Sequence, residues 1–117
     1  MEAAAAEGEI RFGHMIVDGR QVHYAEAGDA TRPAVLFVHG TPGSWQGFDY
    51  YLRDRTLRET RHLIAIDRPG FGRSTDGDWL PDLANQSRII MQAATLNESG
   101  QPLIVVGHSL GGTSAIR

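Results

Sequence analysis

The sequence contains neither cysteine nor lysine among its 117 residues. The absence of cysteine excludes disulfide bonds and thiolate-bound metal ions. It is also typical of proteins in a reducing compartment, so we expect a cytoplasmic location. All 11 basic residues are arginine. The absence of lysine excludes a Walker phosphate loop, a kinase-type lysine and a lysine Schiff base within this sequence.

Excess positive charge and long hydrophobic runs are absent as well. The net charge is −3 and the basic residues are not clustered, so nucleic acid is not an expected partner. No apolar run approaches the roughly 20 residues that span a membrane. The acidic start, MEAAAAEGE, has neither the positive charge nor the apolar core of a signal peptide. The length is that of one ordinary domain, and the hydrophobic share of 41% is normal for a globular protein.

Residues 9–27 have the pattern of a β-hairpin. Apolar side chains alternate with polar ones in both halves of this segment: Ile10, Phe12 and Ile16, then Val22 and Tyr24. The dipeptide Asp18-Gly19 lies between the two halves and is a strong signal for a two-residue turn. The chain is therefore expected to begin with two antiparallel strands.

Three short apolar runs follow, and they predict a parallel sheet. The segments AVLFVHG, HLIAIDRPG and PLIVVGHS are nearly continuous in apolar residues, which is typical of strands buried on both faces. The two segments between these runs can form crossover helices. The sequence thus predicts an α/β fold in which an antiparallel hairpin precedes parallel strands joined by helices.

The expected helices cover residues 44–60 and 81–99. The first begins with Ser44 as a candidate N-cap, and the second ends before Gly100 and Pro102. The apolar positions of the first are Trp45, Phe48, Leu52 and Leu57. The face predicted for the second consists of Leu80, Leu83, Ala84, Ser87, Met91 and Ala94.

Each predicted parallel strand ends in a glycine-rich turn. The turns are HGTPG at residues 39–43, DRPGFGRS at residues 67–74 and GHSLGG at residues 107–112. Parallel strands place their carboxyl ends at one edge of the sheet, which is where ligands bind in open α/β folds. We therefore expect the three turns to converge on one site.

The third turn matches the G-x-S-x-G pattern of a nucleophile elbow, Gly107-His108-Ser109-Leu110-Gly111. In an elbow the serine lies in a strained strand-to-helix turn. Larger side chains two residues before or after it would collide with the neighbouring strand and helix. The N-terminus of the following helix favours negative charge developing near the serine. Ser109 is therefore the candidate catalytic nucleophile, and an idle serine in a glycine-rich loop is the alternative.

The first turn is interpreted as an oxyanion loop. The backbone N–H groups of Thr41 and Leu110 are the candidate donors to a substrate carbonyl oxygen. A simple turn shaped by proline and glycine is the alternative interpretation. His39 and His108 lie within these motifs, and we expect them to pack or to form hydrogen bonds within the loops rather than to act as general bases.

The second turn supports no competing function. Its Gly70-Phe71-Gly72 stretch is followed by Thr75, which breaks the dinucleotide-binding pattern G-x-G-x-x-G. Asp67 is expected to shape this loop rather than to serve as a catalytic acid. The five histidines have no metal-ligand spacing, and we expect no metal ion.

These motifs resemble those of the α/β-hydrolase fold family, specifically its small esterase-like and lipase-like members. Residues 39–43, 67–74 and 107–112 fit the order and spacing of the turns after strands three, four and five of the family sheet. The hairpin fits strands one and two, so the resemblance covers nearly the whole chain.

The resemblance implies a serine-type hydrolase that acts by nucleophilic acyl transfer on a small-molecule ester or related carbonyl substrate, without a cofactor. Family members that open epoxides or remove halide carry aspartate at the elbow. Serine instead fits esters, thioesters, amides, lactones or products of carbon–carbon cleavage, and some relatives catalyse cofactor-free perhydrolysis. The alternative is a non-catalytic protein, either a truncated product or a hydrolase-fold binding module.

The resemblance also implies that residues 1–117 are the N-terminal part of a single α/β-hydrolase domain. In the family the acid and the histidine of the catalytic triad follow the elbow in the order Ser, Asp or Glu, His. Neither follows Ser109 in this sequence. We therefore expect residues 1–117 to be inactive alone and to require the C-terminal half or self-association to stay in solution.

Overall fold

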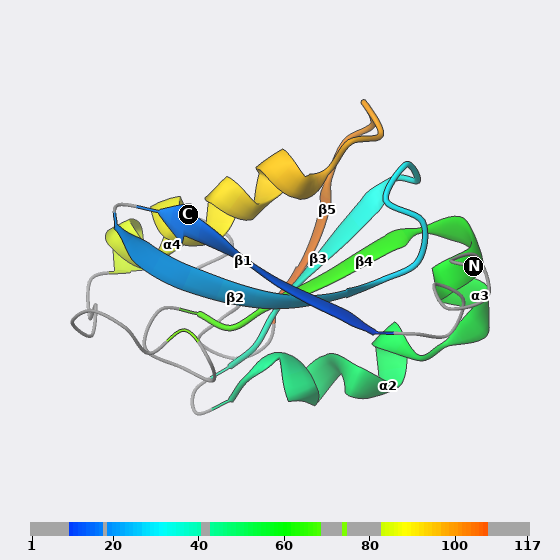
Figure 1. The fold of residues 1–117 in the computed structure, drawn as a ribbon, viewed down its shortest axis with the longest axis horizontal. Helices are drawn as coiled ribbons and strands as arrows, with labels where there is room; N and C mark the ends of the chain where they lie inside the picture. The colour runs from blue at the N-terminus through cyan, green and yellow to red at the C-terminus, as the bar shows by residue number, and fades with distance from the viewer. Residues whose placement is uncertain (1–9, 18, 41–42, 69–73, 75–82, 108–117) are drawn as a thin grey trace.

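The computed structural model describes residues 10–17, 19–40, 43–68, 74 and 83–107, which form one mixed sheet covered by helices on both faces (Figure 1). The five strands have the order β1-β2-β4-β3-β5. Their bounds are β1 (Arg11–Val17), β2 (Arg20–Ala27), β3 (Ala34–Val38), β4 (His62–Ile66) and β5 (Ile104–Gly107). The hairpin strands pair antiparallel with each other, β2 pairs antiparallel with β4, and β3 pairs parallel with both β4 and β5.

The predicted hairpin is confirmed. Val17 pairs with Arg20, which leaves two residues for the turn, and Gly19 adopts a φ of 79° that favours glycine. The apolar alternation did not identify the buried face of β1, because Phe12 and Ile16 are 51% and 61% exposed. The opposite face packs inward, where Val17 joins a small core cluster.

The parallel strands are also confirmed, and β3 and β4 are buried along their whole length. Alternate side chains of these strands enter two separate cores. On one face Val35, Phe37 and Leu63 pack against Phe48 and Leu52, which lie in the helical segment after β3. On the other face the strand residues Leu36, Val38, Ile64 and Ile66 pack against Ile90 and Ala93. The continuous apolar runs thus reflect burial on both faces.

The helix predicted over residues 44–60 is broken into three short pieces. They are the 3₁₀ helix η1 (Trp45–Phe48) and the α-helices α2 (Asp49–Leu52) and α3 (Arg55–Thr60). Ser44 caps the first piece as predicted, since its side chain accepts the Gln46 N–H at 3.2 Å. Asp54 begins the last piece by accepting the Leu57 N–H at 3.0 Å. The second cap explains the break, because an N-cap residue has a non-helical backbone.

The helix predicted over residues 81–99 is shorter than expected. It comprises α4 (Leu83–Met91) and the 3₁₀ helix η2 (Gln92–Leu96), and residues 81–82 lie outside the described part of the chain. The helix ends at Asn97, whose side-chain oxygen accepts the Ser99 N–H at 3.2 Å. Asx turns of this kind compete with helical hydrogen bonds.

The predicted buried face of this second helix was only partly correct. Ser87 is buried as expected, whereas Met91 and Ala94 are only half-buried. The residues that face the sheet have the i, i+3, i+4, i+7 spacing of an amphipathic helix: Gln86, Ile89, Ile90 and Ala93. Leu80 lies outside the described residues.

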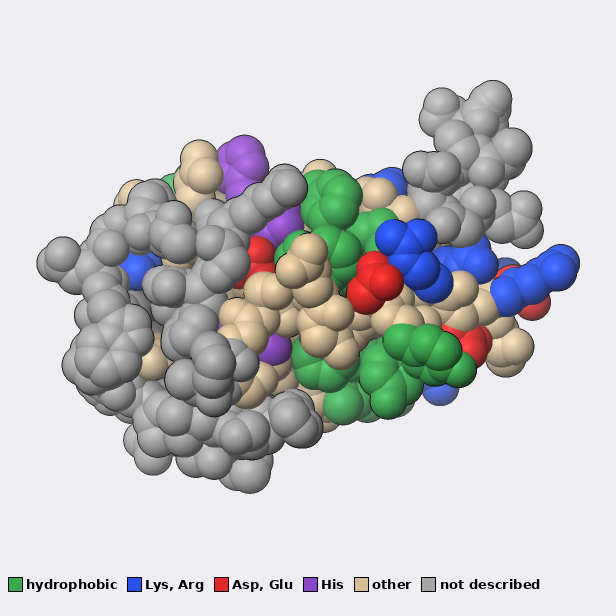
Figure 2. All heavy atoms as spheres, turned by 90° about the horizontal axis from the view of Figure 1, so that it is seen from below, with side chains coloured by type: hydrophobic (Ala, Val, Ile, Leu, Met, Phe, Trp, Pro, Cys, Tyr) green, Lys and Arg blue, Asp and Glu red, His purple; other side chains and the backbone are tan. Residues whose placement is uncertain are grey.

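Strand β5 differs from its parallel neighbours because it lies at the edge of the described sheet. Its side chains Ile104 and Val106 are 44% and 39% exposed. Hydrophobic side chains also reach the surface on the α2 side of the molecule (Figure 2), where Tyr50 and Tyr51 are 77% and 46% exposed. None of the helices in the described part of the chain has the length and apolarity needed to cross a bilayer.

Candidate active site

The three parallel strands end at the same level of the sheet. Val38 of β3 pairs with Ile66 of β4 on one side and with Gly107 of β5 on the other. The turns after these strands therefore start side by side. Residues 41–42, 69–73 and 108–112 of these turns lie outside the described residues, so their convergence on one site stays a prediction. The predicted site residues Ser109, Thr41 and Leu110 lie outside the described residues, so their roles stay predictions.

His39 is the first residue after β3, and it is 3% exposed. Its Nδ1 lies 2.7 Å from the carbonyl oxygen of Gly40, and its Nε2 accepts the Arg68 N–H at 3.0 Å. The pKa of His39 is lowered, mainly by burial and further by the charge of Arg68. The hydrogen bond to Gly40 and the charge of Asp67 oppose this shift. As expected, His39 forms hydrogen bonds within the loops.

Asp67 follows β4 and is completely buried. Its Oδ1 accepts the backbone N–H of Trp45 at 2.7 Å, and its Oδ2 accepts a hydrogen bond from Nδ1 of His23 at 2.8 Å. The Asp67 N–H in turn donates to the carbonyl oxygen of His23 at 2.8 Å. The carboxylate joins β2, β4 and the segment after β3. Its predicted role in shaping the turn over residues 67–74 stays a prediction, because residues 69–73 lie outside the described residues.

Two further buried polar contacts support these strand ends. Ser74 is fully buried, and its Oγ accepts the backbone N–H of His23 at 2.7 Å. The guanidinium group of Arg68 is buried and donates to Oε1 of Gln86 on α4 at 3.0 Å. Burial lowers the pKa of Arg68. The end of β4 is thereby fixed to the hairpin on one side and to a helix on the other.

Sequence reasoning did not identify His23, Trp45 or Gln86 as partners of these loops. The contacts join residues that are 44, 22 and 18 positions apart. No local spacing indicates such pairs, because they depend on how the strands are ordered in the sheet. The only available signal was His23, a histidine beside the apolar residues of the second hairpin strand.

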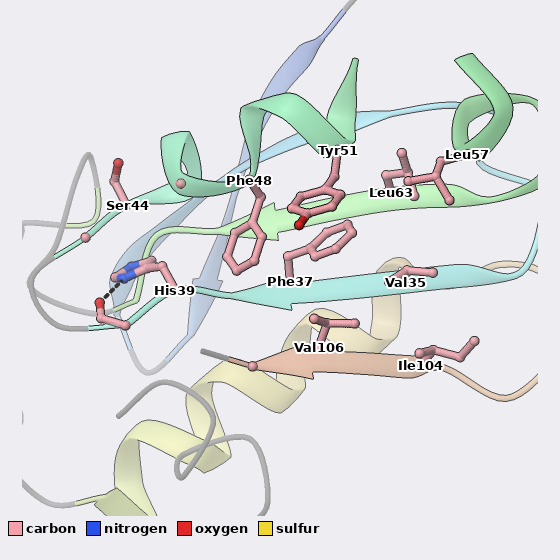
Figure 3. A pocket seen from close by; sticks show the side chains of 14 residues that line it. Val35, Phe37, His39, Ser44, Phe48, Tyr51, Leu57, Leu63, Ile104 and Val106 are labelled. Atoms are coloured by element: carbon pink, nitrogen blue, oxygen red, sulfur yellow. Dashed lines mark hydrogen bonds between the residues drawn. The ribbon is translucent and has the colours of Figure 1, made fainter. Parts of the chain in front are cut away.

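A cavity of about 900 Å³ opens beside the turn after β3 (Figure 3). His39 and Ser44 line its polar end, where the His39–Gly40 hydrogen bond is drawn. The rest of the wall is apolar and includes Phe37, Phe48 and Val106. Phe37 and Phe48 stack in a tilted pair with ring centroids 4.9 Å apart. Such a wall suits packing against another apolar element or an apolar ligand.

Metal ligation has no support in the described part of the chain, where no three side chains of the ligating types gather. The polar groups at the strand ends instead form hydrogen bonds to one another and to the backbone. What the described residues show at this edge is a set of buried polar side chains that hold the ends of neighbouring strands together.

Comparison with known proteins identifies the family. A model of the alpha/beta hydrolase family matches residues 35–117. The chain belongs to the alpha/beta hydrolase family, and the α/β-hydrolase fold predicted from the sequence is confirmed.

The similar proteins have several different activities in their names. Epoxide hydrolase 3 of Xenopus tropicalis is 29% identical over 113 residues, which cover 96% of this chain and 30% of that protein. The sn-1-specific diacylglycerol lipase ABHD11 of Mus musculus is 32% identical over 90 residues, which cover 76% of this chain and 28% of that protein. A proline iminopeptidase of Lactobacillus helveticus is 28% identical over 111 residues.

Solved structures give the same fold. The Cif epoxide hydrolase from Acinetobacter nosocomialis superposes with a TM-score of 0.76 at 28% identity and covers 94% of this chain. A bacterial membrane phospholipase A superposes with a TM-score of 0.77 at 27% identity and covers 97% of this chain. The chain spans 33% and 37% of these two structures, so it corresponds to about a third of its relatives' length.

Proposed function

We propose that this chain carries the nucleophile and the oxyanion donors of a serine hydrolase that acts by acyl transfer on an ester or related carbonyl substrate. Ser109 is the nucleophile in this proposal, and the N–H groups of Thr41 and Leu110 are the oxyanion donors. The observation that carries it is the shared register at which β3, β4 and β5 end. Because of this register, the HGTPG turn and the GHSLGG turn begin next to each other.

The proposed reaction follows from these groups. The Ser109 oxygen attacks the substrate carbonyl carbon while a base removes the hydroxyl proton. The two N–H groups stabilise the oxyanion of the tetrahedral intermediate. The intermediate collapses to an acyl-serine as the leaving group departs with a proton, and water then releases the acid. A serine hydroxyl is a weak nucleophile without a base, so the proposal requires a histidine and an acid from elsewhere in the protein.

We further propose that residues 1–117 form the first part of a single hydrolase domain. The relatives are about three times as long as this chain, and the triad order of the family places the acid and the histidine after the elbow. In that arrangement a following segment would cover the exposed side chains of β5 and the apolar cavity beside them. The alternative is a non-catalytic protein that keeps the elbow without the chemistry.

Epoxide hydrolysis is the second candidate, because several relatives are named epoxide hydrolases. The family resemblance associates that reaction with an aspartate at the elbow, whose carboxylate forms an ester with the opened epoxide. Position 109 is serine in this chain. The residue at the elbow therefore favours acyl transfer.

A substrate panel tests the proposal. The protein encoded by the whole open reading frame, called the intact protein below, is assayed with p-nitrophenyl butyrate and with styrene oxide. We expect ester turnover that Ser109→Ala lowers by several orders of magnitude, and no turnover of the epoxide. Turnover of the epoxide alone favours the second candidate. A folded intact protein that turns over neither substrate favours the non-catalytic alternative.

A further inference from the structure

Two buried side chains form hydrogen bonds between the ends of the neighbouring strands β3 and β4. His39, at the end of β3, accepts a backbone N–H from Arg68, which follows β4. Asp67, at the end of β4, accepts a backbone N–H from Trp45, which follows β3. The residue that follows each strand thus binds, through its side chain, a backbone N–H in the segment that follows the other strand. Because both side chains are buried, water does not compete for these hydrogen bonds.

The first contact lies at the start of the HGTPG turn, and the second lies two residues after its end. At the start of the turn, the His39 ring donates from Nδ1 to the carbonyl oxygen of Gly40 at 2.7 Å. After the turn, the Trp45 N–H is held by Asp67 at 2.7 Å. Gly43 lies close to the first of these contacts, since a Cβ atom there would come within 2.9 Å of the Gly40 carbonyl oxygen and 3.1 Å of His39 Nδ1. Gly40 and Trp45 are therefore each held by a buried side chain.

The hydrogen bonds of His39 define its protonation state. The Arg68 N–H must donate, so Nε2 carries a lone pair, and the Gly40 carbonyl must accept, so Nδ1 carries the proton. The ring is therefore neutral. A second proton on Nε2 would point at the Arg68 N–H and break that contact. Burial of the ring and the charge of Arg68 lower the pKa of His39 and favour the neutral form, whereas the hydrogen bond to Gly40 and the charge of Asp67 oppose this shift.

Asp67 has a second anchor in the hairpin. Its other oxygen accepts from the ring of His23 on β2, and the backbone N–H of His23 donates to Ser74. The phenyl ring of Phe12 on β1 stacks on the His23 ring with centroids 5.7 Å apart. The carboxylate therefore holds Trp45 from a position that is itself fixed by three strands.

We propose that His39 and Asp67 are paired positioning residues that form a clamp: they bind Gly40 and Trp45, the described residues on either side of Thr41, and join them to the end of β4. Resting on the proposed function, this clamp holds the Thr41 N–H where the oxyanion forms. Neither side chain touches the reacting atoms in this proposal. Their effect should therefore appear in kcat rather than in KM, because an oxyanion donor interacts more strongly with the transition state than with the substrate.

Four variants of the intact protein separate the clamp from general packing. His39→Phe keeps a ring but removes both of its hydrogen bonds, whereas His39→Gln retains an amide oxygen that can accept the Arg68 N–H. Asp67→Leu removes both acceptors, whereas Asp67→Asn retains one for Trp45. The controls are Thr56→Ser and Glu59→Gln, which change exposed residues on α3, a helix that supplies no residue to the clamp.

Kinetics of p-nitrophenyl butyrate hydrolysis give the first readout. We expect His39→Phe and Asp67→Leu to lower kcat by about 10- to 100-fold, the effect of a misplaced catalytic group, with KM changed less than threefold. His39→Gln and Asp67→Asn should recover at least a third of the wild-type kcat. Folded variants with an unchanged kcat, or with a raised KM and an unchanged kcat, would overturn the role in positioning the oxyanion donor.

Hydrogen exchange of backbone amides gives a readout that needs no activity. The clamp predicts that Asp67→Leu speeds exchange at Trp45 and that His39→Phe speeds exchange at Arg68, while the controls leave both unchanged. Wild-type exchange rates at both amides in the folded variants would overturn the clamp. An intact protein without esterase activity would refute the proposed function, and the exchange result would still decide whether the clamp exists.

Discussion

At the scale of single residues, the buried polar groups have specific partners that cross between strands. Besides His39 and Asp67, Glu26 on β2 joins His62 on β4, whose Nε2 donates to Oε2 of Glu26 at 3.0 Å. Arg11 lies 3.4 Å from the other carboxylate oxygen. This second cluster lies at the start of β4, and it stabilises the sheet rather than the candidate site.

The pH dependence of stability should reveal the Glu26 contact. The pKa of Glu26 is lowered, mainly by the hydrogen bond from His62. Burial opposes this lowering, and the charges of His62 and Arg11 contribute to it. A lowered pKa in the folded state stabilises the protein above the unfolded pKa, and this stabilisation is lost as the pH falls through the folded pKa. We expect Glu26→Gln to cost about 1 kcal/mol of unfolding free energy at pH 7. The cost should shrink toward pH 3 in urea titrations, and a pH-independent cost would contradict this assignment.

The Thr41 backbone gives a second test at this scale. If its N–H is an oxyanion donor, Thr41→Pro removes the donor and should lower kcat by about 10²- to 10³-fold. Thr41→Ser keeps the N–H and should retain most of the activity. Steady-state ester hydrolysis by the two folded variants makes the comparison, and an active proline variant would move the donor elsewhere.

The roles of individual residues were predictable in kind but not in partner. The sequence indicated that His39 packs or forms hydrogen bonds within its loop and that Asp67 shapes the turn it begins. It could not indicate Arg68 as a partner of His39 or Trp45 as a partner of Asp67. Those contacts exist because β3 and β4 are neighbours in register, a property of the assembled sheet.

At the scale of elements, strands were predicted better than helices. The runs in β3 and β4 are apolar because both faces are buried, and this signal is present in the sequence itself. The helix ends were set by side chains that form hydrogen bonds with the nearby backbone, at Asp54 and Asn97. Hydrophobic periodicity does not reveal this competition between side chains and helical hydrogen bonds.

Two glycines with left-handed backbones provide a matched pair of substitutions. Gly19 has a φ of 79° with open space around it, whereas Gly28 has a φ of 84° with the carbonyl oxygens of Arg61 and Arg58 where a Cβ atom would lie. Gly19→Ala should cost about 1–2 kcal/mol, the cost of this conformation for an L-residue. Gly28→Ala should cost at least about 3 kcal/mol, because overpacking adds to the conformational cost.

Chemical denaturation of the two glycine variants measures both costs. The order is the informative result, because the two positions share a backbone conformation and differ in what surrounds them. Equal destabilisation would show that the carbonyl groups beside Gly28 move aside at little cost.

At the scale of the whole molecule, the described sheet has one edge where apolar side chains are exposed. Strand β5 lies at the sheet edge with Ile104 and Val106 exposed, and an apolar cavity of about 900 Å³ lies beside it. An exposed apolar edge strand is a template for pairing with other chains. The relatives, at about three times the length, have further chain with which such an edge can be covered.

Residues 1–117 produced alone should therefore associate and bind a hydrophobic dye. Gel filtration should show oligomers or aggregate, and Val106→Lys should shift the protein toward monomer by placing a charge on the exposed face. Tyr50→Lys is the control, since Tyr50 is exposed on a helix away from the strand edge. A monodisperse wild-type monomer with a cooperative melting transition would contradict this expectation.

Covalent labelling of Ser109 tests the central claim most directly. The intact protein is treated with a fluorophosphonate, which reacts with activated serines, and the adduct is located by mass spectrometry. The account predicts one adduct, on the peptide that contains Ser109, and its loss in Ser109→Ala and in the heat-denatured protein. An adduct on another serine, such as Ser44 or Ser74, or a folded protein that hydrolyses esters without labelling at Ser109, would contradict it.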